Sequence, residues 1–70
     1  MKFDLEIIVM DAQTGVVYNS VRVPGFVKKN DAIAFGRTES RAQEQSQQRI
    51  RNRKCVARYL VTQKPGEGFR

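Results

Sequence analysis

The residues best able to do chemistry in this chain are cations gathered in the stretch QQRIRNRKCVARYLV, residues 47–61. Guanidinium and ammonium groups that converge on a nucleic-acid backbone bind phosphates, and arginine adds a planar fork that fits phosphate oxygens or a guanine edge. Lys28 and Lys29 form a second, smaller basic pair earlier in the chain. The sequence therefore predicts a nucleic-acid-binding surface that uses Arg49, Arg51, Arg53, Lys54, Arg58, Lys28 and Lys29.

The same basic run also has an ordinary structural explanation. Cations near the C-terminus of a helix offset its dipole by about 0.3–1 kcal/mol each, and their long stems can cover apolar surface. Arg37 and Arg41 are expected to be solvated side chains on the outer face of the same helix. Polyanion binding and helix termination are therefore both open explanations of the run from Arg49 to Arg58.

The residue types disfavour catalysis and metal binding. The chain has no His and one Cys, at position 55, so it lacks the usual acid–base group at neutral pH and the ligand spacing of a zinc site. Cys55 is expected to be a small buried hydrophobe. We therefore expect a non-enzymatic protein with no catalytic residue, no metal site, no cofactor and no small-molecule substrate.

The net charge of +6 is unevenly distributed, with −1 over residues 1–26 and +7 over residues 27–70. Such an imbalance favours an acidic partner, either DNA or RNA or an acidic protein.

The single cysteine fits a reducing compartment. Asp4 and Glu6 interrupt the N-terminal apolar residues, so no signal peptide is expected, and no apolar run approaches the about 20 residues of a membrane span. We expect a soluble cytoplasmic protein that does not bind membranes, of a size that would suit a virus-encoded accessory regulator.

The hydrophobic pattern predicts a strand, a second strand, a helix and a third strand. Residues 2–10, 16–23 and 55–63 alternate as half-buried strands do, and the segment DAQTG joins the first two as a short hairpin loop. A loop centred on Gln13 pairs residues whose numbers sum to about 26, which sets the register. The pairs expected from this register include Leu5–Val21, Val9–Val17, Asp4–Arg22 and Ile8–Tyr18.

The helix is expected over residues 32–53, with Asn30 or Asp31 as its N-cap. Gly36 costs about 1 kcal/mol relative to Ala within a helix, so a bend or restart is expected near Thr38. On a helical wheel one stripe is predicted to face the sheet, and it contains Ala32, Phe35, Ala42, Ser46 and Ile50, with Glu39 among them.

These elements predict a single α+β domain over residues 1–63, followed by a loose tail over residues 64–70. The first strand has aliphatic residues on both faces and belongs in the middle, which gives a three-stranded antiparallel sheet of order 2-1-3 with the helix on one face. The other face has no cover and is the candidate protein interface. Its predicted residues are Ile8, Met10, Val16, Tyr18 and Leu60, with Val56 beside them.

Two functions follow from these patterns. The first is a small basic nucleic-acid-binding or nucleic-acid-associated regulatory protein. The alternative is a protein-binding module, an inhibitor or adaptor of a larger host protein, that acts through the apolar sheet face. A homodimer through that face is a further expectation, and the sequence does not separate DNA from RNA.

Overall fold

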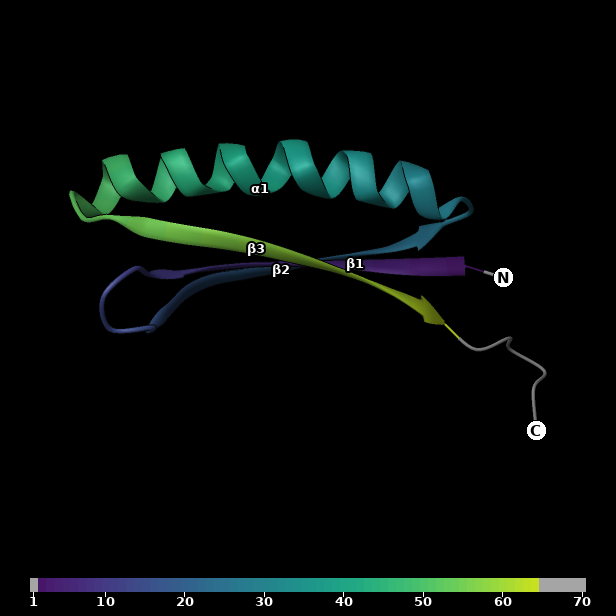
Figure 1. The fold of residues 1–70 in the computed structure, drawn as a ribbon, viewed down its shortest axis with the longest axis horizontal. Coiled ribbons are helices and arrows are strands. Elements are labelled where there is room, and N and C mark those ends of the chain that lie inside the picture. The colour runs from purple at the N-terminus through teal and green to yellow at the C-terminus, as the bar shows by residue number, and fades with distance from the viewer. Residues whose placement is uncertain (1, 65–70) are drawn as a thin grey trace.

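The computed structural model describes residues 2–64, which form β1 (Lys2–Asp11), β2 (Val17–Phe26), α1 (Lys29–Arg51) and β3 (Cys55–Lys64) in that order. β1 is the central strand of an antiparallel sheet of order β2-β1-β3. α1 lies across one face of the sheet, and the opposite face carries no covering element in this part of the chain (Figure 1). The predicted α+β fold and strand order are confirmed.

The core lies between β1 and α1. Alternate residues of β1 face the helix, and Leu5, Ile7 and Val9 are fully buried there, where each such side chain contributes about 1.5–3 kcal/mol. Ala32 of α1 and the free thiol of Cys55 on β3 complete the buried apolar set. Because strand side chains alternate between faces, the residues between them on β1 face the open side of the sheet.

The predicted register between β1 and β2 is wrong by two residues. Leu5 pairs with Val23 and Ile7 pairs with Val21, so the opposed residue numbers sum to 28 instead of 26. An even shift keeps each side chain on its expected face over this part of the ladder, since the side-chain period of a strand is two.

The hairpin end of the β1–β2 ladder contains a bulge that changes the face of one residue. Val9 pairs with Asn19 and Met10 pairs with Val17, which leaves Tyr18 as the extra residue on β2. Val17 is therefore opposite Met10 on the open face, although the sequence predicted it to face inward. Tyr18 is turned toward the end of α1, as its contacts below show.

α1 begins at Lys29, one turn earlier than predicted, with Lys28 at the N-cap and no side-chain hydrogen bond there. It runs through Gly36 to Arg51 without interruption, and its C-cap is Asn52, which has a left-handed φ of 53°. The restart expected near Thr38 is therefore wrong.

The predicted sheet-facing stripe of the helix is also largely wrong. The buried residues of α1 are Ala32, Gly36 and Ser40, whereas Ile50 is 71% exposed and Phe35 is 41% exposed. Phe35 packs against Phe26 of β2 instead, with ring centroids 5.7 Å apart.

Two expectations concern the ends and the environment of the chain. Lys64 is the last residue of β3, and the rest of the predicted tail, residues 65–70, lies outside the described residues. Across residues 2–64, no helix combines the length and the apolar character needed to cross a bilayer.

Candidate nucleic-acid interface

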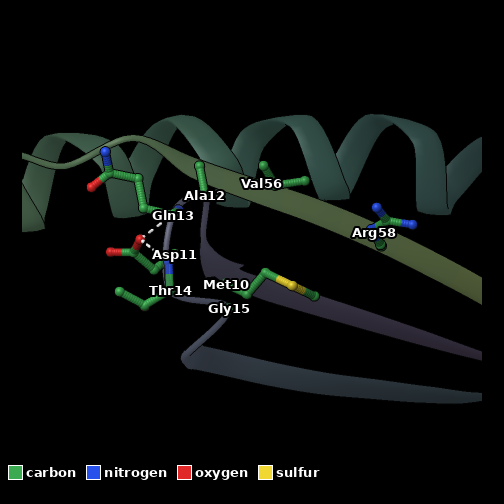
Figure 2. Close-up of a pocket in the computed structure, with 8 residues that line it drawn as sticks. All are labelled: Met10, Asp11, Ala12, Gln13, Thr14, Gly15, Val56 and Arg58. Atoms are coloured by element: carbon green, nitrogen blue, oxygen red, sulfur yellow. Dashed lines mark hydrogen bonds between the residues drawn. The ribbon is translucent and has the colours of Figure 1, made fainter.

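The carboxylate of Asp11 organises the hairpin end of the molecule. Its Oδ1 accepts the backbone N–H of Gln13 at 2.7 Å and of Thr14 at 3.0 Å, which closes the turn after β1 (Figure 2). Its Oδ2 accepts the hydroxyl of Tyr18 at 2.7 Å and Nε of Arg53 at 2.7 Å. Although Asp11 is buried, its charge is thus matched by four donors from the turn, β2 and the segment before β3.

These hydrogen bonds determine the protonation states of Asp11 and Tyr18. The hydrogen bond from Tyr18, followed by those from the backbone of Thr14 and Gln13, holds the pKa of Asp11 well below its usual range, and the charge of Arg53 acts in the same direction. The same hydrogen bond raises the pKa of Tyr18 above its usual value. At neutral pH the contact therefore joins a carboxylate to a protonated phenol.

Two arginines of the predicted basic run contact Tyr18 and Asp11. The guanidinium of Arg51 lies over the Tyr18 ring, with Cζ 4.1 Å from the ring centroid, and its Nε donates to Oε1 of Gln47 at 2.9 Å. Arg53 uses its Nε for Asp11, and its side chain is 50% exposed. A guanidinium has five N–H donors. These contacts orient both groups through Nε, and within residues 2–64 they leave the terminal donors available.

Arg49 and Lys54 complete what we call the helix-end cluster, defined as Arg49, Arg51, Arg53 and Lys54. Both side chains are exposed, and neither takes part in the ion pairs found in residues 2–64. The backbone near Lys54 is fixed, because its carbonyl accepts the N–H of Ala12 at 3.0 Å. The cluster thus surrounds the C-terminus of α1 with cations, of which Arg53 alone is paired with an acid in this part of the chain.

The remaining predicted cations lie elsewhere. Arg58 is exposed on the open face, opposite Ile8, and lines a shallow pocket of about 280 Å³ with Met10, Val56 and the hairpin turn (Figure 2). Lys28 and Lys29 stand at the start of α1, about 33 Å from the helix-end cluster at 1.5 Å per helical residue. The seven predicted residues therefore do not form one site.

The open face holds most of the predicted protein-interface residues. Ile8 and Met10 are half-buried there, and Leu60 is 57% exposed. Val16 is 55% exposed in the hairpin connection, where its carbonyl accepts the N–H of Asp11. The placement of Tyr18 on this face is wrong, because the bulge directs its hydroxyl to Asp11 and its ring to Arg51.

The opposite end of the open face is charged. Arg22 pairs with Asp4 at 3.6 Å, as the sequence suggested, although the Cα partner of Arg22 is Glu6. Oδ1 of Asp4 is buried without a hydrogen-bond partner in the described residues. The ion pair therefore lies at the end of the open face away from the hairpin, and Glu6 is opposite Leu60 between the two ends.

The sequence did not identify Asp11 as a partner of Tyr18 and Arg53. The position of Asp11 at the start of a turn indicates its bonds to the backbone, but its two side-chain partners come from other segments and carry no local signal. No family model, curated protein or solved structure matches the chain, so its function is inferred from this geometry.

Proposed function

We propose that the protein is a small, non-enzymatic nucleic-acid-binding or nucleic-acid-associated regulatory protein that holds phosphates with its helix-end cluster. The observation that supports this most is the orientation of Arg51 and Arg53 by Nε contacts that leave their terminal donors available, beside exposed Arg49 and Lys54. A cytoplasmic location belongs to the same proposal, because one free cysteine suits a reducing compartment.

Orientation of the two arginines lowers the cost of binding. Immobilising a rotamer-rich side chain at an interface costs about 0.5–1.5 kcal/mol, and Tyr18 and Asp11 already restrict Arg51 and Arg53 in the free protein. The end of a helix presents carbonyl groups, which do not bind phosphate, so the contacts would come from the side chains. Contacts to phosphates carry no sequence information, and the expected binding is insensitive to base sequence.

Charge reversal tests this proposal. Fluorescence anisotropy with a labelled duplex, and separately with a labelled single strand, would measure the affinity of the wild-type protein and of the R49E/K54E variant. The R37E/R41E variant is the matched control, because it changes the net charge equally on exposed residues of α1 that lie outside the cluster. We expect the cluster variant to lose binding and the control to retain most of it. Equal loss in both variants, or no binding by the wild type, would contradict the proposal.

A second function is supported by the open face. Val17 is 56% exposed and Leu60 is 57% exposed, next to half-buried Ile8 and Met10, and apolar surface of this kind usually marks a protein contact. The protein would then act as an inhibitor or adaptor of a larger protein, or as a homodimer. Sedimentation of the wild-type protein and of Leu60→Asp tests the homodimer directly, since only a dimer through this face would dissociate on the substitution.

A further inference from the structure

β3 is an edge strand whose outward N–H groups are only partly covered. Ala57 N–H donates to Oε2 of Glu44 at 2.9 Å, and Cys55 N–H donates to Oε1 of Gln48 at 3.1 Å. These bonds show that the odd-numbered residues of β3 direct their N–H groups away from β1. The pairing of β1 with β3 is regular along its length, so the N–H groups of Tyr59 and Val61 point the same way.

α1 covers the first half of this edge and leaves the second half open. Figure 1 shows α1 close above the start of β3, and the two elements part toward Lys64. In residues 2–64, neither Tyr59 nor Val61 has a partner for its outward N–H. An exposed edge of this kind is a template for another strand, because it presents N–H donors and carbonyl acceptors in alternation.

A groove runs between this edge and the helix. Its volume is about 350 Å³, and it is lined by Arg37, Ser40, Arg41 and Glu44 of α1 and by Ala57 and Tyr59 of β3. Arg37 and Arg41 stand one helical turn apart, and both are exposed. These two arginines were expected to be ordinary solvated side chains, whereas the fold places them beside Ala57 and Tyr59 of the β3 edge.

The charges around the groove are unbalanced. Neither Arg37 nor Arg41 takes part in the ion pairs found in the described residues, and the same holds for Arg58 on the other side of β3. Glu44 is the acid that lines the groove, and its Oε2 is engaged by Ala57 N–H. The edge is thus flanked by cations on both faces of the sheet and is complementary to an acidic chain.

We propose that this groove binds an acidic peptide segment in extended conformation, which adds to the sheet beside β3. Backbone carbonyls of the peptide accept the N–H groups of Tyr59 and Val61, and acidic side chains on its helix-facing side pair with Arg37 and Arg41. A nucleic-acid strand offers phosphate acceptors but no repeating N–H donors for the carbonyl groups of the edge. The site goes beyond the helix-end cluster and uses none of its residues.

A synthetic peptide of alternating Glu and Val tests the proposal on the isotope-labelled protein. We expect saturable binding, together with slower solvent exchange of the Tyr59 and Val61 amides. The R37E/R41E variant should bind at least about tenfold more weakly, and R37A/R41A should show a smaller loss. The R49E/K54E variant is the matched control and should bind normally, because Arg49 and Lys54 do not line the groove. Far-UV circular dichroism checks the fold of each variant.

Four results would overturn this assignment. They are no binding of the peptide, equal binding of a peptide with Lys in place of Glu, equal binding of a peptide whose alternate amides are methylated, and loss of binding in R49E/K54E alone. A single-stranded oligonucleotide that displaces the peptide and protects the same amides would assign the groove to nucleic acid instead. Because the two proposals depend on separate residue pairs, either one can fail while the other holds.

Discussion

Gly36 of α1 lies directly against Tyr59 of β3, so that a Cβ on residue 36 would sit 2.8 Å from Cδ2 of the tyrosine ring. The same Cβ would sit 2.8 Å from Cδ1 of Leu5 on β1, which is fully buried. The helix therefore meets two strands at a residue without a side chain. This close approach is what brings Glu44 and Gln48 within hydrogen-bonding distance of the β3 edge.

Gly36→Ala should destabilise the protein although alanine favours helices. Helix propensity alone would stabilise by about 1 kcal/mol, but overpacking of a core typically costs about 1–3 kcal/mol, so the net loss should be up to about 2 kcal/mol. Urea unfolding followed by circular dichroism measures it. Ala34→Gly changes an exposed position of the same helix, so it measures the effect of helix propensity on stability without a change in core packing. A Gly36→Ala protein more stable than the wild type would show that the contact is not close.

The contact between β1 and α1 predicts contrasting effects of substitution for two aliphatic residues, one on each element. Leu5→Ala removes a fully buried side chain and should cost about 2–5 kcal/mol in the free energy of unfolding. Ile50 is 71% exposed, so Ile50→Ala should change stability by less than about 0.5 kcal/mol. A large loss of stability in Ile50→Ala would show that Ile50 packs against the sheet, as the sequence predicted.

The elements and their order were predictable because they depend on strong patterns. The alternation over residues 2–10 and the aliphatic character of both of its faces identify a central strand, and Cys55 was correctly expected to be buried. The register was not predictable in the same way. It depends on a bulge at Tyr18, which is stabilised by contacts with Asp11 and Arg51, and these partners come together only in the folded chain.

The helix face was misjudged for a related reason. The hydrophobic pattern predicts a buried stripe that contains Phe35 and Ile50. The residues of α1 that are buried are instead Gly36 and the residues one turn before and after it, Ala32 and Ser40. Small residues allow a helix to approach a sheet but add little to a hydrophobic pattern. The position of Arg37 and Arg41 beside Ala57 and Tyr59 of β3 could not be predicted for a similar reason, because the sequence supplies the charges and the fold decides which of them are close together.

The ionisation of Asp11 should make the stability of the protein depend on pH. Its pKa is lowered in the folded protein, so the ionised group contributes stability above its unfolded pKa of about 4, and this contribution is lost as the pH falls through the folded value. Asp11→Asn should be less stable than the wild type at neutral pH, and the difference should shrink as the pH falls below about 4. Urea unfolding at several pH values measures both curves. A difference that stays constant with pH would mean that the carboxylate is not specially stabilised.

Glu44 should protect one backbone amide. Glu44→Ala leaves the N–H of Ala57 without the acceptor it has in the structure, which should cost about 1 kcal/mol and speed the exchange of that amide. Glu44→Gln keeps an acceptor oxygen at the same reach and should preserve most of the protection. Hydrogen exchange of the Ala57 amide in the three proteins gives the comparison, and identical rates in Ala and Gln variants would contradict the role of the side chain.

The salt dependence of duplex binding tests the helix-end cluster most directly. If Arg49, Arg51, Arg53 and Lys54 all contact phosphates, the logarithm of the binding constant should fall against the logarithm of salt concentration with a slope of about −3.6. Removing two of the four contacts in the R49A/K54A variant should reduce the slope to about −1.8. A wild-type slope near zero, or the same slope in the variant as in the wild type, would contradict phosphate binding by this cluster.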